Sequence, residues 1–328
     1  MKHLSTSYTA ILLLICASFL ISCDDEDENE IKNDNTVFDY FENNPDYSVL
    51  TNAIEVAGLR STLDGRGTFT VFAPNNDALS LFLSSNNLDL NNLTPEERTL
   101  LQQVLLYHVL ETEVLSSGFS TDYVKTAAVD GAGFPLDLYV DADDLTLNEI
   151  PLDANLIDIE LDNGIVHALD GTLSLPSIVT LLSLNPDFSN LETALTQENL
   201  VTALADEDVL FTVLAPTNAA FTALIDADTN DDLDDINDVL QIADLDEILK
   251  FHVISDTSLR EDDFTDGLQV NTFADGNSTF TVDASDGAPV ITVDGVTLAN
   301  FEFTNITARN GVIHSIDNLL FAGMEEAN

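Results

Sequence analysis

The stretch TFTVFAPNNDAL, residues 68–79, occurs almost a second time as LFTVLAPTNAAF at residues 210–221, and seven of the twelve positions are identical. Side chains over the shared FTV alternate between two faces, as they do in a β-strand. Pro74 and Pro216 then end the hydrogen-bond ladder, because proline lacks the backbone N–H. The following Asn-rich segment can cap a helix. The stretch therefore predicts a strand-to-helix corner that the chain uses twice.

Three further landmarks recur in the same order, and the offset between copies grows from 141 to 147 residues. They are NPDYSVL at 44–50 with NPDFSNL at 185–191, LLYHVL at 105–110 with LKFHVI at 249–254, and NGIVHALDGTL at 163–173 with NGVIHSIDNLL at 310–320. A solenoid would have a far shorter period, so the pattern indicates a duplicated domain with small insertions. The predicted divisions are a signal peptide at 1–22, a lipidated Cys and acidic tether at 23–34, domains at 35–176 and 177–322, and a tail at 323–328.

The landmark LLYHVL, with its counterpart LKFHVI, closes a predicted helix in each copy. Thr94 and Glu97 flank a proline in the order of a capping box, and an apolar stripe then runs along the helix to His108. The second copy repeats the stripe from Asp244 to His252. Both histidines are therefore expected at the end of a buried helix face.

The last landmark predicts a hairpin, because Asn-Gly stands between two alternating strands in each copy. His167 and His314 share a face with apolar neighbours on the final strand. Asp170 and Asp317 follow them by three residues, and an odd separation on a strand sends side chains to opposite faces. These His-Asp pairs therefore cannot chelate one ion.

Apart from His3, every histidine belongs to this duplicated set, which raises the question of chemistry. Neither copy contains cysteine, and the motifs HExxH, GxSxG, CxxC and a phosphate-binding Gly-rich loop are absent from the sequence. A nucleophile-base arrangement stays open, because Ser, Thr and Asp are plentiful. Hydrogen-bonded core histidines are the favoured interpretation, and the protein is not expected to be an enzyme or to need a cofactor.

The net negative charge of the chain excludes nucleic acid as an expected partner. Nine Lys and Arg face 59 Asp and Glu, a formal charge of −50 that repels phosphate backbones and opposes protein-mediated binding to anionic lipid. The acidic stretch DADTNDDLDD at 226–235 places Asp226, Asp228 and Asn230 at the first three ligand positions of an EF-hand-like loop. Its sixth position is aspartate instead of glycine. A weak Ca²⁺ site and a solvated acidic loop are both compatible with this stretch.

The first residues predict export. An apolar run from Ala10 to Ile21 is too short to span a membrane and has the length of a signal peptide core. It ends in LISC, which resembles the lipobox of bacterial lipoproteins, so Cys23 would carry the lipid. The following DDEDENE is typical of a solvated tether and also resembles the acidic tag that sends some Gram-negative lipoproteins to the cell surface.

The ordered landmarks resemble the fasciclin-type domain, the fold of fasciclin I and β-Ig-h3, over nearly all of the mature chain. The resemblance implies an α+β fold in each copy, a twisted β-sandwich or wedge with helices packed around it. It assigns fold-signature roles to Pro74, Asn76, Gly164, His167, Asp170, Pro216, Asn218, Gly311, His314 and Asp317. In animal members the Tyr-His region has been linked to integrin binding, and it corresponds here to Tyr107, His108, Phe251 and His252.

Together these features predict an outer-membrane lipoprotein, exposed at the cell surface. Its two fasciclin-type domains would mediate adhesion to a cell-surface protein, a matrix protein or a polysaccharide, with avidity from the two copies. The alternative is an envelope module that binds a soluble ligand or Ca²⁺ and has no adhesive role.

Overall fold

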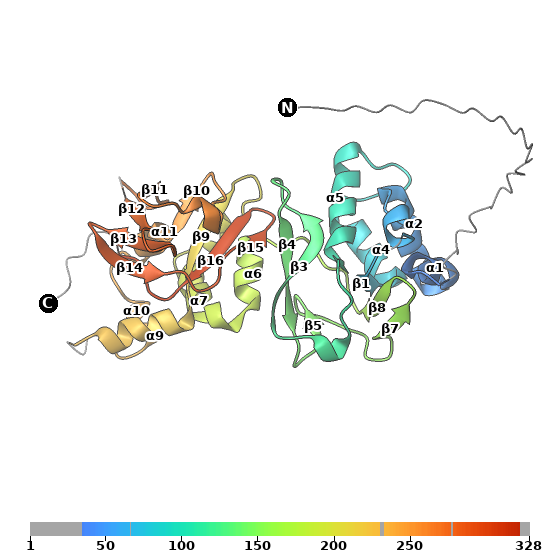
Figure 1. Cartoon of the computed structure of the whole chain (residues 1–328), viewed down its shortest axis with the longest axis horizontal. Helices are drawn as coiled ribbons and strands as arrows, with labels where there is room; N and C mark the ends of the chain where they lie inside the picture. Colours follow the sequence, from blue (N-terminus) through green and yellow to red (C-terminus); the bar gives the residue numbers. More distant parts are fainter. Residues whose placement is uncertain (1–34, 66, 230–232, 277, 322–328) are drawn as a thin grey trace, which may run out of the picture. The chain divides into compact units, whose positions relative to one another are not determined.

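The computed structural model describes residues 35–65, 67–229, 233–276 and 278–321. The signal peptide, Cys23 and the acidic tether lie outside the described residues, as does the predicted tail. From Asn35 onward the chain forms one compact unit in which the same order of elements occurs twice (Figure 1). We call residues 35–176 the first domain and residues 177–321 the second domain.

The first domain begins with helices and ends with strands. Its helices are α1 (Val37–Asn43), η1 (Pro45–Tyr47), α2 (Ser48–Ala57), α3 (Arg60–Leu63), α4 (Asn76–Ser85), α5 (Pro95–Tyr107) and η2 (Ser116–Gly118). Its strands are β1 (Phe69–Pro74), β2 (Val109–Leu110), β3 (Asp122–Val129), β4 (Pro135–Asp141), β5 (Thr146–Leu147), β6 (Ile150–Pro151), β7 (Ile159–Leu161) and β8 (Gly164–Leu169).

The second domain repeats this order with one additional short helix between its corner strand and the strand that pairs antiparallel with it. Its helices are α6 (Ile178–Leu184), η3 (Pro186–Phe188), α7 (Ser189–Gln197), α8 (Val201–Leu204), α9 (Asn218–Ala227), α10 (Ile236–Val239), α11 (Leu245–Phe251) and η4 (Glu261–Asp263). Its strands are β9 (Phe211–Pro216), β10 (Val253–Ser255), β11 (Gln269–Asn271), β12 (Thr279–Asp283), β13 (Val290–Val293), β14 (Val296–Asn300), β15 (Ile306–Ala308) and β16 (Gly311–Ile316).

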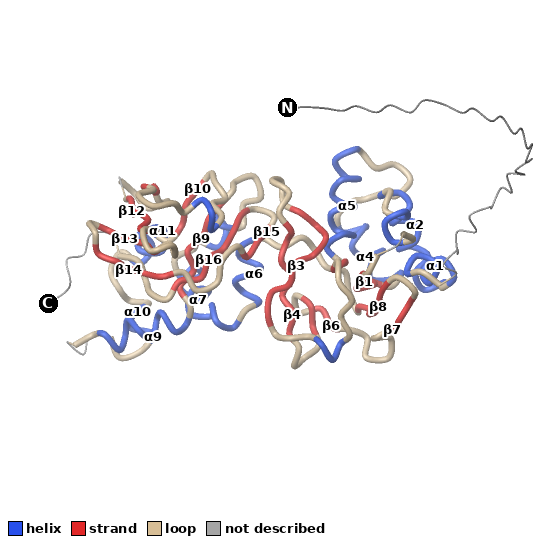
Figure 2. The backbone as a smooth tube through the Cα atoms, viewed as in Figure 1, coloured by secondary structure: helices blue, strands red, loops and turns tan. Residues whose placement is uncertain are grey.

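Each domain contains two four-stranded sheets; their strands are coloured red in Figure 2. The first domain has the orders β2-β1-β8-β7 and β3-β4-β5-β6, and the second has β10-β9-β16-β15 and β11-β12-β13-β14. The corner strand pairs in parallel with the last strand of its own domain, β1 with β8 and β9 with β16. The other strand pairs are antiparallel. The α+β architecture predicted from the sequence is therefore confirmed.

The corner strand lies at the centre of each domain because both of its faces are buried. In β1, Val71 and Ala73 belong to the cluster that packs against the helices, whereas Phe72 belongs to the cluster shared with the second sheet. In β9 the alternation is the same, with Val213 facing the helices and Leu214 facing the second sheet. Because side chains alternate along the strand, one face of the first sheet packs on the helices and the other face packs on the second sheet.

The caps of the equivalent helices differ between the two domains. Asn75 alone caps α4, through its side-chain oxygen and the N–H of Ala78, and α5 has the expected capping box at Thr94. The equivalent helix α11 has no side-chain cap, because Asp244 adopts a left-handed backbone with φ 58°. Capping residues therefore differ between the copies, whereas the apolar stripes that bury the helices recur.

The hairpins before β8 and β16 form as predicted, but their turns lie one residue earlier than Asn-Gly suggests. Leu161 pairs with Gly164, so the two turn residues are Asp162 and Asn163. A Cβ on Gly164 would stand 2.4 Å from the carbonyl oxygen of Phe69 on β1. This glycine is therefore required by the close approach of β1 to β8 rather than by the turn.

Candidate functional site

Two of the motif histidines, His108 and His252, directly follow α5 and α11 in the interior. His108 Nδ1 lies 2.7 Å from the carbonyl oxygen of Val104, and Nε2 accepts the backbone N–H of Leu173 at 3.0 Å. His252 repeats both contacts in the second domain, at 2.8 Å each. Both rings therefore connect the end of a helix to the segment that follows the last strand of the domain.

The other two, His167 and His314, sit on the final strands and are equally engaged. His167 Nε2 lies 2.9 Å from the carbonyl oxygen of Val114, and Nδ1 accepts the N–H of Asp158 at 3.2 Å. His314 makes the equivalent contacts at 2.8 and 3.4 Å. Both side chains are fully buried.

Burial determines the charge of these rings. It lowers the pKa of His108, His252 and His314 to about 4 and also lowers the pKa of His167, while in each case a backbone carbonyl opposes the change. Each histidine is therefore neutral near pH 7, with both nitrogens in contact with backbone groups. No ring nitrogen is left over for a metal ion or a substrate proton.

The predicted adhesion region lies in the core. Tyr107 is 0 % exposed; its hydroxyl donates to the carbonyl oxygen of Asp137 at 2.6 Å and accepts the amide of Asn148 at 2.9 Å. Phe251 replaces it in the second domain and packs edge-on against Phe280. Together with His108 and His252 these residues present no surface of their own. An adhesive role for this region stays a prediction, and neighbouring side chains would have to make the contact.

Asn76 and Asn218 explain why the NPD segment and the strand-to-helix corner recur together. The side-chain oxygen of Asn76 accepts the N–H of Val49 at 2.8 Å, and its amide donates to the carbonyl of Pro45 at 2.8 Å and to Ser48 Oγ at 3.1 Å. Asn218 makes the three equivalent bonds in the second domain. The strand-to-helix corner is thus tied to the NPD turn in both copies.

Asn163 and Asn310, for which the Asn-Gly pattern predicted only a place in a turn, form a second pair of clamps. Asn163 is 2 % exposed; its oxygen accepts the N–H of Val37, and its amide donates to the carbonyls of Leu63 and Gly65, all within 2.9 Å. Asn310 repeats all three bonds within 3.0 Å. The signal was present in the sequence, because this asparagine is identical in both copies.

The acidic residues of the motifs lie at the domain surface. Asp170 is exposed, whereas the carboxylate of Asp317 accepts the backbone N–H of Asn300 at 2.7 Å and its side-chain amide at 2.6 Å. Both follow the last strand of their domain. Pro74 and Pro216 are the last residues of β1 and β9, as the corner motif predicts.

The calcium candidate is only partly described. Asp226 lies in α9, and the carboxylate of Asp228 accepts the N–H of Leu233 at 2.8 Å. Asn230 lies outside the described residues. Across the described ranges, no group of three or more His, Cys, Asp or Glu side chains is arranged to hold a metal ion. Calcium binding at this loop stays a prediction.

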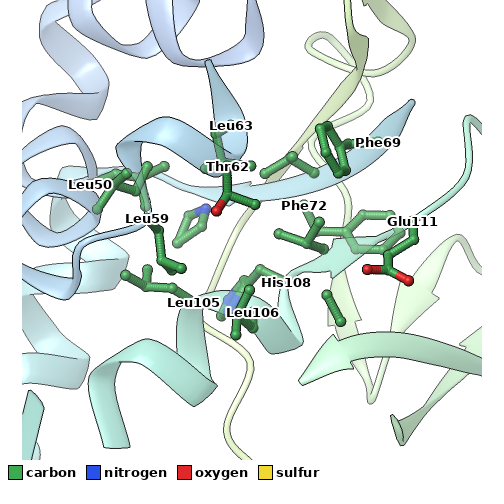
Figure 3. A pocket seen from close by; sticks show the side chains of 15 residues that line it. Leu50, Leu59, Thr62, Leu63, Phe69, Phe72, Leu105, Leu106, His108 and Glu111 are labelled. Atoms are coloured by element: carbon green, nitrogen blue, oxygen red, sulfur yellow. The ribbon is translucent and has the colours of Figure 1, made fainter. Parts of the chain in front are cut away.

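A small apolar cavity of about 100 Å³ lies in the first domain between α2, α5 and β1 (Figure 3). Leucine side chains, among them Leu59 and Leu105, surround it together with His108, and the carboxylate of Glu111 lies near Phe72 at one side. Ala127 on β3 also lines it.

The second domain has a phenylalanine where the first has Ala127. The segment Thr272-Phe273-Ala274 corresponds to Thr126-Ala127-Ala128. The Phe273 ring packs edge-on against Phe211, the counterpart of the cavity residue Phe69, with centroids 6.4 Å apart. In the second domain a phenylalanine ring thus occupies the position that Ala127 holds beside the cavity in the first.

A polar joint connects the two domains, and no sequence motif predicted it. Asp137 on β4 is 3 % exposed; its carboxylate accepts Lys125 Nζ at 2.5 Å and the N–H of Thr307 on β15 at 2.6 Å. Lys125 also donates to the carbonyl of Asn305 at 2.7 Å. Burial raises the pKa of Asp137, and the nearby ammonium of Lys125 opposes this rise.

Arg260 of the second domain completes the joint. Its guanidinium donates to Asp130 Oδ2 and to Thr307 Oγ1, both at 2.6 Å, and stands 4.3 Å from the ring centre of Phe134. Separately, the hydroxyl of Tyr123 on β3 donates to the carbonyl of Leu181 in α6 at 2.7 Å. Two of the chain's nine Lys and Arg residues therefore hold the domains together. Because basic residues are so few in this sequence, each of them was a candidate for such a structural ion pair.

Within the described residues, no helix is both long and apolar enough to cross a membrane.

Comparison with known proteins identifies the repeated unit. The model of the fasciclin domain family matches residues 45–176 and 186–322. The chain is 28 % identical over 266 residues to transforming growth factor-beta-induced protein ig-h3 of Oryctolagus cuniculus, covering 80 % of this chain and 36 % of that protein. It is 26 % identical over 272 residues to human periostin, covering 81 % of this chain and 30 % of periostin.

A solved structure of a FAS1 domain pair from the insect cell adhesion molecule fasciclin I matches with TM-score 0.48 and 19 % identity. The match covers 83 % of this chain and 96 % of that one. The chain spans about a third of the length of the curated relatives named above. Fasciclin domains are known as adhesion and interaction modules and are generally non-catalytic.

Proposed function

The chain belongs to the fasciclin domain family, and from this membership we propose that it is a surface-anchored adhesion lipoprotein. Its two domains would contact another cell, a matrix protein or a polysaccharide. The observation that carries the proposal is the match of a known interaction module to both halves of the chain. The neutral, backbone-bound histidines also support a role in binding over one in catalysis.

The anchor is part of the same proposal. The LISC sequence would attach lipid at Cys23, and the acidic segment after it would extend as a tether, since like charges repel one another. Two domains on one tether would bind a repetitive partner with avidity, because the second contact becomes intramolecular. The polar joint supports this arrangement by limiting how freely the domains can move.

Protease treatment of intact cells tests the anchor and its orientation. We expect added protease to remove the wild-type protein, as detected by an antibody to the second domain, while a periplasmic control protein survives. The Cys23→Ala variant should lose membrane association. Protection of the wild type until the outer membrane is opened would contradict surface exposure.

Cell settling tests the adhesive role. Cells that carry the wild-type protein should aggregate or bind a matrix-coated surface more than cells that produce Cys23→Ala at equal levels. Equal behaviour of the two strains, with the wild type shown to be surface-exposed, would argue against adhesion and leave the soluble-ligand alternative.

A further inference from the structure

A second, larger cavity of about 510 Å³ lies beside the polar joint. The β3–β4 hairpin of the first domain supplies one wall, and η3 with the segment before β15 supplies the other. Four aromatic side chains line it: Tyr123, Tyr139, Phe188 and Phe303. Phe303 is 62 % exposed, which is unusual for so large an apolar side chain and leaves its ring accessible from the cavity.

Tyr139 has a hydroxyl without an intramolecular partner. The residue is 6 % exposed, and its ring packs against Tyr123 with centroids 5.2 Å apart. Its hydroxyl makes no hydrogen bond within the part of the chain that the structure describes, and the hydroxyl oxygen is not fully buried. The free hydroxyl therefore opens on the cavity that Tyr139 lines.

Several side-chain donors around the cavity are already occupied. The ammonium of Lys125 binds Asp137 and the carbonyl of Asn305, and the Tyr123 hydroxyl binds a backbone carbonyl in α6. Thr304 Oγ1 donates to Glu261 at 2.5 Å.

Acceptors, by contrast, are available. Asp187 in η3 is exposed, and its carboxylate makes no hydrogen bond or ion pair within the described residues. The carboxylate of Asp122 accepts only the N–H of its neighbour Tyr123. Lys125 and Asp137 cancel, so Asp122 and Asp187 leave the cavity with two net negative charges. Burial, followed by the charges of Asp141, Asp187 and Asp122, raises the pKa of Tyr139 and keeps its phenol neutral.

We propose that this cavity receives an arginine side chain from a basic segment of a partner protein. A guanidinium carries five N–H donors and no acceptor, which matches the available carboxylates of Asp122 and Asp187. Its planar group also stacks on aromatic rings, and four aromatic residues line the cavity. The strongly negative chain would attract a basic segment from a distance. A neutral sugar would gain nothing from either charge effect.

The inference deepens the proposed adhesive function by naming the chemistry of the partner, and it rests on that function. Its test uses purified protein, whereas surface exposure and adhesion are tested on cells. The two can therefore fail independently.

NMR titration with a short peptide tests the site. The probe is acetyl-Gly-Arg-Gly-amide, added to the mature chain from residue 23 with Cys23→Ser so that it carries no lipid. We expect saturable shifts at the Tyr123 and Tyr139 ring signals. The same peptide with citrulline, a neutral isostere of arginine, should bind at least about tenfold more weakly, because it lacks the charge-assisted bonds.

Three variants separate the site from diffuse charge. Asp122→Asn with Asp187→Asn should weaken binding by about tenfold or more, and Tyr139→Phe by about threefold. Tyr139→Phe should fold normally, because the hydroxyl that it removes has no partner. Asp286→Asn with Asp294→Asn removes the same charge from exposed positions in the β12–β14 region and should bind like the wild type.

Three results would overturn the proposal. Equal binding of the arginine and citrulline peptides would show that charge is irrelevant. Equal weakening by the control pair would reduce the effect to general electrostatic attraction. Shifts of the tyrosine signals by the neutral disaccharide maltose, without shifts by the arginine peptide, would assign the cavity to a saccharide instead.

Discussion

The β3–β4 hairpin of the first domain and the β11–β12 hairpin of the second are equivalent in register but differ in what their faces carry. Val124 pairs with Leu138 in one and Val270 pairs with Phe280 in the other. The adjoining pairs are Tyr123 with Tyr139 and Lys125 with Asp137 in the first domain, and Gln269 with Thr281 and Asn271 with Thr279 in the second. The first set contacts the other domain and lines the cavity beside it; of the second set, three residues are exposed and Thr281 is half-buried.

This difference separates two kinds of residue in a duplicated protein. The asparagine clamps, the buried histidines and the close-approach glycines recur because each domain needs them to close its own core. The hairpin face does not serve the core of its own domain, so it could diverge. One copy carries aromatic and charged side chains at these positions, and the other carries uncharged polar ones.

The largest effect is expected where the domains are alike. Asn163→Ala and Asn310→Ala each strand one buried N–H and two carbonyls, so each should destabilise its domain by about 3 kcal/mol or more. Urea denaturation measures this, with the exposed helix residue Asn52→Ala as control, expected within about 0.5 kcal/mol of the wild type. A small loss at only one of the two clamps would contradict their equivalence.

The next effect should appear where the domains differ. Asp137→Ala removes the acceptor of Lys125 and of the buried N–H of Thr307, and should cost about 2 kcal/mol. Thr279→Ala, at the equivalent exposed position, should change stability by less than about 0.5 kcal/mol. Asp137→Asn is the informative intermediate, because it keeps an acceptor for Thr307 but loses the charge that holds Lys125. Equal losses at Asp137 and Thr279 would mean that the joint contributes nothing to stability.

A smaller effect should follow from exchanging the residues at the apolar cavity. Phe273→Ala removes a ring that packs on Phe211 and is 38 % exposed, so the loss should be about 1 to 2 kcal/mol, below that of a fully buried phenylalanine. Ala127→Phe should be neutral or stabilising by up to about 1 kcal/mol if the ring enters the cavity. Xenon or benzene binding by the wild type, lost in Ala127→Phe, would report the filling directly. Marked destabilisation by Ala127→Phe would show that the two sites are not equivalent.

The smallest effect near neutral pH concerns the four histidines. Their folded pKa lies below the unfolded value, so the unfolded chain binds more protons and stability is lost as the pH falls from about 6.5 toward 4. Between pH 7 and pH 6 each should cost less than about 1 kcal/mol. NMR titration of the ring protons should show His108 and His252 neutral down to about pH 4. Titration of either ring near pH 6.5 would mean that its burial is lost in solution.

The repeated stretches predicted the elements and their order well, because strand alternation and helical stripes are local properties. Residues 68–79 gave β1 and α4, and the Asn-Gly signals gave both final hairpins. The histidines were expected in the core, since each lies on an apolar face. The predicted turn was wrong by one residue. Gly164 is required by its close approach to β1, a strand almost one hundred residues away in the chain, and not by the turn.

By itself, the sequence determined that the protein is a tandem of one α+β unit, acidic throughout, with its histidines on buried faces. Periodicity, turn residues and duplication are written in short stretches and can be read without knowing what packs where. Only the tertiary structure decided which side chains meet across domains. The Asp137 contact with Thr307 joins residues 170 positions apart. No local pattern encodes such a meeting, because it depends on how two finished domains place their surfaces against each other.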